Sequence, residues 1–459
     1  MSGVRHIWRA HDIRGRTPDE VTPGFARHLG IALGAFLSER GGRSVAVGRD
    51  ARDSGAMLQM ALQDGLASAG MDVANVGQVP TPTVYFAADA LGFDAGVVVT
   101  ASHNPPGYNG FKVRLTDRSL ISADLERIRA LFERQDVAPV SGGSLRELDI
   151  RTKYLDFLVS DCRRPSGPLR MVIDAGNGVA GPMAVRLFSR LGVEVVPLFC
   201  DPDGQFPNHP ADPSVERNLR DLQRAVLSTG ADLGIGLDGD GDRLGVVDRT
   251  GNLIFGDRLL ALFATSILSS GPAAVVADVK CSMALREVVE AAGGRLSMTR
   301  TGYPWIQAQM RALSAPLGGE MSGHYCFADR YFGFDDALYA ATRALSLVSD
   351  LPERIAAVPT YPSIPELRLP MREADKRVVL PLIQARFSEE EDVIAVDGIR
   401  FSYGAGWGLI RTSNTEARLS VRAEARTEAD LAVILQRLRR ILGGLPVEID
   451  LSALELPTC

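Results

Sequence analysis

Three things are scarce in this sequence: paired cysteines, long apolar runs and an excess of basic residues. Its five cysteines include no CxxC pair, which favours reduced thiols and gives no support to a disulfide framework or a His/Cys zinc site. No apolar run reaches the roughly 18 residues of a membrane-spanning helix, and charges stand where a secretory signal would be apolar. The net charge of -6 argues against a nucleic-acid partner. We therefore expect a cytoplasmic protein with no membrane or nucleic-acid partner.

The apolar pattern predicts several layered domains. A length of 459 residues suggests three to four domains, and 46% hydrophobic with 23% charged residues is ordinary for a globular protein. Strand-like and helix-like segments alternate in three successive units, as in α/β domains with largely parallel sheets, and a smaller α+β unit follows. We expect an α/β fold with domains at residues 1–150, 151–252, 253–364 and 365–459.

Residues 97–113 hold the first candidate site. A β-branched strand leads into a loop that carries Ser102, His103 and an asparagine, and the Pro-Pro-Gly after it prevents a helix from starting at once. The Asn-Gly pair at 109–110 predicts a tight turn, and the alternation after it predicts a strand that returns Lys112 toward Ser102. An ordinary strand-loop-strand with a surface serine and histidine is the alternative.

Three carboxylates at alternate positions follow a predicted buried strand: Asp238, Asp240 and Asp242. The glycines between them let the backbone fold tightly and turn the oxygens toward one point, as Mg²⁺ prefers. A cation would also compensate the repulsion among three close carboxylates. An EF-hand does not fit, because Arg243 and Arg249 stand where its Gly and Glu would be. A plain Asp-Gly turn is the alternative.

Two further loops are rich in small and polar residues. Residues 318–324 interleave a carboxylate, a hydroxyl and an imidazole with glycines, which suits the reading of sugar hydroxyls by hydrogen bonds. Residues 411–415 gather a guanidinium with neutral hydroxyl and amide donors, which suits a phosphate dianion. Taken alone, each could be an ordinary polar turn. Near the N-terminus, Arg14 precedes a glycine and is predicted to lie on a turn.

Together, four segments resemble the signature loops of the α-D-phosphohexomutase superfamily, in the order and spacing of its phosphomannomutase/phosphoglucomutase branch: residues 100–105, 238–243, 319–324 and 411–415. The resemblance extends over nearly the whole chain. It implies four domains around a central cleft, three of them similar α/β sandwiches and the fourth a smaller, mobile α+β domain. It also implies that Ser102 carries a phosphoryl group in the active enzyme, with Mg²⁺ held against it by the three aspartates.

The same resemblance implies a role for each matched residue. The catalytic positions are Ser102, His103, Lys112, Arg14, Arg243 and Lys280. The metal ligands are Ser102, Asp238, Asp240 and Asp242. The substrate-binding positions, supported by Asp50, are His11, Arg258, Thr301, Gly302, Tyr303, Glu320, Ser322 and His324. The phosphate-binding positions are Arg411, Ser413, Asn414 and Thr415.

The sequence departs from the family pattern in several places. His11 stands where relatives usually have tyrosine, and Tyr303 stands where they usually have histidine. A phenol with a pKa of about 10 is a poorer proton shuttle than an imidazole of about 6.5, although Tyr303 can donate a hydrogen bond or stack on a sugar. Pro304 and Gln307 are also unusual, and Ala417 replaces a common proline. We expect these changes to affect substrate preference and rate more than reaction class.

The activity that the resemblance implies is a reversible mutase reaction between hexose 1-phosphates and hexose 6-phosphates of mannose or glucose. Phospho-Ser102 and a hexose 1,6-bisphosphate would be its intermediates, Mg²⁺ its cofactor and the bisphosphate its activator. The Glu-Met-Ser form of the sugar loop is associated with mannose and glucose phosphates. A mutase of amino-sugar phosphates and a sugar-phosphate binding protein without turnover are the alternatives. We expect a monomer or weak dimer.

Overall fold

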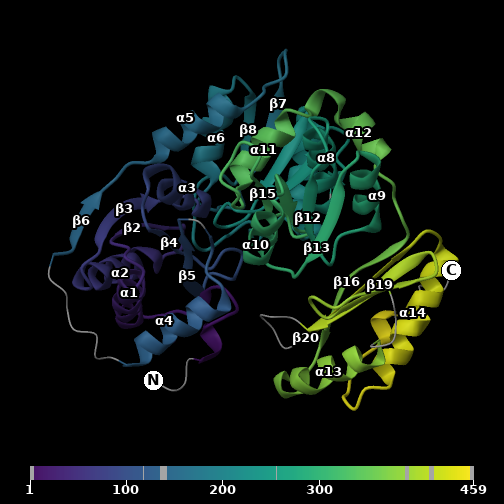
Figure 1. Ribbon diagram of the computed structural model, residues 1–459. Coiled ribbons are helices and arrows are strands. Elements are labelled where there is room, and N and C mark those ends of the chain that lie inside the picture. Colours follow the sequence, from purple (N-terminus) through teal and green to yellow (C-terminus); the bar gives the residue numbers. More distant parts are fainter. Residues whose placement is uncertain are drawn as a thin grey trace.

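The computed structural model describes residues 5–116, 118–134, 142–254, 256–387, 392–412 and 418–454. Four sheets follow one another along the chain, each with its own helices (Figure 1). The predicted fold class, three α/β domains and a smaller α+β domain, is confirmed. None of the helices in the described part of the chain has the length and apolar character needed to cross a membrane.

The first domain has a six-stranded sheet of order β1-β5-β4-β2-β3-β6. Its strands are β1 (Ile13–Arg16), β2 (Ser44–Arg49), β3 (Asp72–Gln78), β4 (Ala95–Val99), β5 (Tyr108–Leu115) and β6 (Ser144–Glu147). Its helices are α1 (Pro23–Ser38), α2 (Gly55–Ser68), α3 (Thr81–Leu91) and α4 (Ser122–Arg134). Strand β4 is buried along its whole length, as its apolar sequence requires of a central strand covered on both faces. The Ser102 loop therefore begins at a fixed point of the sheet.

Two local predictions in this domain are wrong. Residues 109–110 lie inside β5, paired with β1, and do not form a turn. The glycine serves close approach, because a Cβ at Gly110 would lie 1.9 Å from the Ile13 carbonyl oxygen. Arg14 lies in β1 and not on a turn. The pairing of β1 with β5 brings Arg14 to the same edge of the sheet as the Ser102 loop.

The second and third domains are built on parallel cores. The second consists of α5 (Arg151–Asp161), β7 (Arg170–Asp174), α6 (Gly181–Arg190), β8 (Glu194–Leu198), α7 (Arg220–Thr229), β9 (Leu233–Leu237), β10 (Leu244–Asp248) and β11 (Leu253–Ile254). The third consists of α8 (Gly256–Leu268), β12 (Ala274–Asp278), α9 (Met283–Ala291), β13 (Arg295–Thr299), α10 (Tyr303–Leu313), β14 (Leu317–Gly319), β15 (Tyr325–Phe327), α11 (Ala337–Leu345) and α12 (Leu351–Ala357). Helix α11 contacts β9 and β10, so these two domains pack directly on each other.

The C-terminal domain is an antiparallel sheet of order β16-β20-β19-β18-β17. It consists of β16 (Ser363–Pro370), α13 (Lys376–Arg386), β17 (Val393–Ile394), β18 (Ile399–Tyr403), β19 (Gly406–Thr412), β20 (Arg418–Ala425) and α14 (Glu428–Gly443). Figure 1 shows this sheet and α14 standing apart from the other three sheets.

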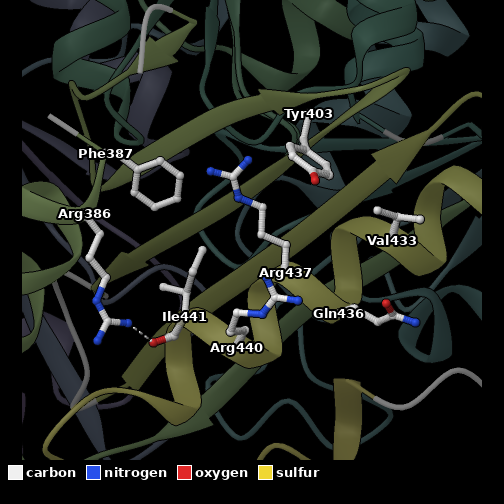
Figure 2. A pocket seen from close by; sticks show the side chains of 8 residues that line it. All are labelled: Arg386, Phe387, Tyr403, Val433, Gln436, Arg437, Arg440 and Ile441. Atoms are coloured by element: carbon white, nitrogen blue, oxygen red, sulfur yellow. Dashed lines mark hydrogen bonds between the residues drawn. The ribbon is translucent and has the colours of Figure 1, made fainter. Parts of the chain in front are cut away.

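A pocket in the C-terminal domain lies between α13, β18 and α14, and three of the residues that line it are arginines (Figure 2). The Arg437 guanidinium lies 4.4 Å from the ring centre of Tyr403 and 5.3 Å from that of Phe387. Arg386 donates to the Ile441 carbonyl at the end of α14. None of the predicted site residues lines this pocket, so the candidate site is sought at the loops that follow the strands.

Candidate active site

Ser102 lies in a tight loop directly after β4. Its backbone has a φ of 52°, the left-handed region that side chains other than glycine rarely adopt. The Ser102 amide donates to the Thr100 hydroxyl at 2.8 Å, and the Ser102 Oγ donates to the Asp238 carboxylate at 2.9 Å. The Oγ also lies 3.1 Å from the His103 Nδ1, and the side chain is buried. The serine of the first domain and the acidic loop of the second therefore meet face to face.

The acidic loop after β9 is folded around one carboxylate. The Asp238 Oδ1 accepts from the backbone amides of Gly241, Asp242 and Arg243 at 3.0 to 3.1 Å. Ligand atoms of Asp238, Asp240 and Asp242 all lie within 4.8 Å of one another. The Asp240 Oδ1 and Asp242 Oδ1 are buried and have no hydrogen-bond partner in the described part of the chain. An oxygen-only donor set with unpartnered buried atoms fits a hard divalent cation such as Mg²⁺.

Lys112 joins two of these carboxylates. Its Nζ lies 2.7 Å from the Asp240 Oδ2 and 2.5 Å from the Asp242 Oδ2, and it is buried. Burial opposes the charged ammonium, but the two aspartates raise the pKa of Lys112 well above its usual value. Asp240 is buried too, yet the Lys112 ammonium lowers its pKa. Burial and the neighbouring carboxylates raise the pKa of Asp238 and of Asp242, so this cluster has more negative charge than Lys112 alone compensates.

Arg14 and Arg243 both lie near the Ser102 loop. The Arg14 guanidinium donates to Asp12 at 2.8 Å and to the Asn104 side chain at 2.9 Å. The Arg243 Nε donates to the His324 Nε2 at 2.9 Å and lies 4.0 Å from the Asp238 Oδ2. Both guanidinium groups are thus placed to neutralise charge that develops near Ser102.

His103 is held neutral. Burial, together with the nearby Arg243 guanidinium, lowers the pKa of His103 well below its usual value. A neutral imidazole beside the Ser102 Oγ can accept a proton or donate a hydrogen bond, depending on its tautomer.

The predicted sugar loop connects β14 to β15 and contacts the acidic loop. The Glu320 carboxylate accepts from the Gly302 amide at 2.5 Å and from the Ser322 hydroxyl at 2.7 Å. The His324 Nδ1 lies 2.8 Å from the Asp335 Oδ2. Burial alone would lower the pKa of His324, but Asp242 and Asp335 raise it. Carboxylate, hydroxyl and imidazole are thus gathered beside the acidic cluster, where a sugar phosphate could be bound.

Two more predicted residues complete the wall between the first and third domains. The His11 ring meets the Tyr303 ring edge to face, with centres 5.2 Å apart. The Tyr303 ring in turn lies 5.7 Å from the His324 ring and 5.8 Å from the Lys112 Nζ. The His11 and Tyr303 pair therefore lies beside the Lys112 ammonium and the His324 imidazole.

Three predicted residues gather instead at the joint between the third and C-terminal domains. The Lys280 Nζ lies 3.6 Å from the Glu366 Oε2. The Thr301 amide and the Arg411 Nε both donate to the Asp397 Oδ2, at 3.1 and 2.8 Å. Arg411 lies in β19 and not in a loop. Ser413, Asn414, Thr415 and Ala417 lie outside the described residues.

Arg258 lies away from the acidic cluster. Its guanidinium donates to the backbone carbonyls of Ile355, Val358 and Pro359 and to the Thr360 hydroxyl. These bonds fix the end of α12, where the chain leaves the third domain, and a substrate contact by Arg258 stays a prediction.

The sequence analysis missed Arg52, which organises the Ser102 loop from within. Its guanidinium is buried and donates to four carbonyls of that loop, those of Ser102, Asn104, Pro105 and Tyr108. Its Nε donates to Asp50, which also accepts from the Thr100 hydroxyl at 2.7 Å. Two opposite charges directly after the buried strand β2 are the signal that could have revealed this pair.

Comparisons with known proteins agree over the whole chain. The phosphoglucomutase/phosphomannomutase family models match at residues 5–138, 152–251 and 255–360 for α/β/α domains I to III, and at 366–441 for the C-terminal domain. A phosphomannomutase/phosphoglucomutase of Pseudomonas aeruginosa is 42% identical over 453 residues, which cover 96% of this chain and 97% of that protein. A phosphoglucomutase of Neisseria gonorrhoeae is 41% identical over 451 residues, which cover 96% and 98%.

Solved structures agree as well. The crystal structure of a phosphoglucomutase/phosphomannomutase family protein from Burkholderia thailandensis matches with a TM-score of 0.90 and 41% identity, covering 96% of this chain and 99% of that chain. A phosphomannomutase structure from Thermus thermophilus, described as putative, matches with a TM-score of 0.78 at 25% identity, covering 95% and 98%.

Proposed function

The chain belongs to the phosphoglucomutase/phosphomannomutase family, and on that premise we propose that it interconverts hexose 1-phosphates and hexose 6-phosphates through a phosphoryl group on Ser102. One observation supports this most: the Ser102 Oγ donates to Asp238 at 2.9 Å, inside a cluster of three carboxylates. A nucleophilic hydroxyl beside a cation site is the arrangement that reversible phosphoryl transfer requires.

The first transfer moves the phosphoryl group from Ser102 to the free hydroxyl of a hexose phosphate and gives a hexose 1,6-bisphosphate. The bisphosphate turns around and returns its other phosphate to Ser102. Such transfers depend mainly on alignment and charge neutralisation. Arg14 and Arg243 beside the Ser102 loop, and Lys280 at the third-domain joint, are the side chains that supply positive charge.

Asp238, Asp240 and Asp242, with an oxygen of the phosphorylated Ser102, would hold Mg²⁺. When bound, the ion neutralises charge on the phosphoryl group during transfer. A phosphoryl group on Ser102 replaces the proton that Asp238 now accepts, so the serine ester and the carboxylate would repel each other. The acidic cluster therefore needs a cation most when Ser102 is phosphorylated. His103, whose Nδ1 lies 3.1 Å from the Ser102 Oγ, or Lys112 handles the proton at that oxygen.

Glu320, Ser322 and His324 would bind sugar hydroxyls, and the C-terminal domain would grip the phosphate that does not react. Arg411, whose guanidinium already faces Asp397, is the described member of that grip. Because one grip must serve both ends of the sugar, the C-terminal domain has to move between the two half reactions.

A coupled assay tests the proposal. Mannose, glucose and N-acetylglucosamine 1-phosphates are offered to wild type, Ser102→Ala and the exposed control Ser160→Ala, with Mg²⁺ and catalytic bisphosphate. Wild type and Ser160→Ala should convert mannose or glucose 1-phosphate, and Ser102→Ala should lose more than roughly 10³-fold in kcat/KM. Faster turnover of the amino-sugar phosphate would mean that the enzyme is a mutase of amino-sugar phosphates. Turnover by Ser102→Ala within tenfold of wild type would rule out a covalent carrier there.

A further inference from the structure

The contact between His11 and Tyr303 joins two of the predicted substrate-binding positions, one in the first domain and one in the third. His11 belongs to the segment before β1 of the first domain, and Tyr303 is the first residue of α10 in the third. Their rings meet edge to face at 82°. An imidazole is thus present at this point of the site, although it comes from the first domain and a phenol stands opposite it.

The Tyr303 hydroxyl is poorly suited to proton transfer. It is buried, has no hydrogen-bond partner among the described residues, and lies near the equally unpartnered Tyr85 hydroxyl. Burial, with the Asp335 carboxylate, raises the pKa of Tyr303 well above its usual value. The ring of Tyr303 lies close to His11, Lys112 and His324.

The His11 imidazole has the opposite properties. Its Nδ1 is buried and has no hydrogen-bond partner among the described residues. Burial lowers the pKa of His11 below its usual value, so the ring is neutral at pH 7 and keeps a nitrogen lone pair free. The side chain as a whole is only half-buried, which leaves it accessible from the site.

The charged groups around His11 come from four elements. Asp12 belongs to its own segment, Arg14 to β1, Lys112 to β5 and Glu320 to the loop after β14, and the uncharged Tyr303 ring packs from α10. The two carboxylates raise the pKa of His11 and the two cations lower it. With these opposing contributions, burial decides the direction.

We propose that His11 is a catalytic residue that accepts the proton of the attacking sugar hydroxyl, and that Tyr303 is the aromatic wall that orients its imidazole. This proposal rests on the mutase function proposed above and adds the group that activates the substrate. Lys112 and His103 are at the Ser102 end of the reaction, whereas His11 packs on Tyr303 next to Gly302, whose amide donates to Glu320.

The proton and the phosphoryl group move in a balanced way. The sugar oxygen forms a bond to phosphorus, the bond between phosphorus and the Ser102 Oγ breaks, and the sugar proton passes to His11. The Ser102 Oγ takes a proton from the Lys112 ammonium. The return transfer reverses both proton movements, so the enzyme recovers its starting protonation state and no further reactant is consumed.

The first test compares His11→Gln with the exposed control His6→Gln. We expect His11→Gln to lower kcat by roughly 10² to 10⁴, with a smaller change in KM, because a general base is lost. The wild-type kcat should fall on the acid side of the ordinary histidine pKa, as His11 becomes protonated, and this acid limb should be absent in His11→Gln. His6→Gln should stay within about threefold of wild type and keep the acid limb. If His11→Gln keeps wild-type kcat or the acid limb, or if His6→Gln is equally impaired, the proposal is wrong.

The second test exchanges the two side chains. His11→Tyr should lose activity as His11→Gln does, and the double variant His11→Tyr/Tyr303→His should recover at least about tenfold, because an imidazole returns to the contact from the other side. A double variant that is no more active than His11→Tyr would overturn the proposal. This test does not depend on His11→Gln, so it holds even if that variant does not fold. A wild-type protein that converts no hexose phosphate would instead refute the proposed function, so the two failures are distinguishable.

Discussion

The first three domains and the C-terminal domain are joined in different ways. One apolar core runs from Ala46 to Val358 and contains residues of all three N-terminal domains. The C-terminal domain has a separate core, from Leu369 to Leu454, and its apolar contact with the third domain is a small cluster around Trp407. Ser102 and the acidic loop therefore lie on a shared core, whereas the predicted phosphate grip lies on a domain with a core of its own.

Polar contacts form most of the interface between the third domain and the C-terminal domain. The Arg400 Nη1 donates to the carbonyls of Val279 and Cys281, both at 2.7 Å, and Glu424 accepts from the Met283 amide at 2.8 Å. Such bonds can be exchanged for water with little net free energy, in contrast to apolar packing. The difference teaches that charge chemistry needs fixed geometry, while a sugar that must be held in two orientations needs an adjustable grip.

The largest expected effect on stability is at Lys112, in the three domains that share one apolar core. Lys112→Met removes the buried cation between Asp240 and Asp242 and should reduce the free energy of unfolding by about 3–5 kcal/mol without divalent cations. Mg²⁺ should then raise the Tm of the variant more than that of wild type, because it replaces the lost positive charge. Scanning fluorimetry with Mg²⁺ and with EDTA measures this, and the exposed Lys153→Met is the control. Equal Mg²⁺ shifts in all three proteins would contradict the idea.

The second largest effect should be that of acid on the polar interface between the third and C-terminal domains. Burial opposes the charge of Glu366, but Lys280 and the Ser420 hydroxyl lower its pKa to about 2, below the ordinary 4.5. Its stabilisation is therefore complete above pH 4.5 and is lost as the pH falls through 2, with about 2 kcal/mol lost by pH 3. The hydrogen-exchange protection factors of β16 and β20, which are corrected for the intrinsic exchange rate, should fall between pH 5 and 3 in wild type. If Glu366→Gln shows the same fall, Glu366 is not its cause.

A substitution at the joint should change substrate binding more than chemistry. Arg400→Met removes the bonds to the third domain and should raise KM about tenfold, with kcat within about threefold of wild type. Steady-state kinetics beside the exposed control Arg377→Met measures this. A loss confined to kcat would mean that the C-terminal domain takes part in the transfer step itself.

The smallest effect should come from Asp336, which lies where the second and third domains pack on each other. Its contribution to stability should depend on pH in the opposite sense to that of Glu366. Burial raises the pKa of Asp336 to about 6, although Tyr331 and Tyr154 donate to it. The folded protein thus binds the proton more tightly, and the contribution of Asp336 to stability falls as the pH rises from about 4 through 6. Between pH 5 and 7.5 this amounts to about 1.4 kcal/mol. The difference in Tm between these two pH values should be smaller in Asp336→Asn than in wild type. An unchanged difference would mean that another group causes the pH dependence.

Much of the fold could be predicted because apolar periodicity is local. The buried strands β2, β4, β7, β9 and β12 lie where their apolar runs indicate. The Asn-Gly pair at 109–110 misled, because a glycine that lets β1 approach closely looks the same in sequence as one in a turn. Strand β1 has four residues and pairs with a strand nearly 100 positions away, so nothing local indicates it.

The candidate site was predictable where single loops carry the chemistry, as at Ser102 and the three aspartates. Side chains that act across domains were not. Arg52 binds four carbonyls of a loop some 50 residues further along the chain, and Asp335 reaches His324 only after β15 turns back. Such partners depend on tertiary geometry, for which a single sequence has no periodic signal.

Mass spectrometry of the intact protein and of its Ser102 peptide tests the central claim most directly. After incubation with hexose 1,6-bisphosphate and Mg²⁺, the account predicts about 80 Da of added mass on that peptide, which disappears when excess hexose 1-phosphate is supplied. Full turnover by a protein that never carries this mass on Ser102 would contradict the account.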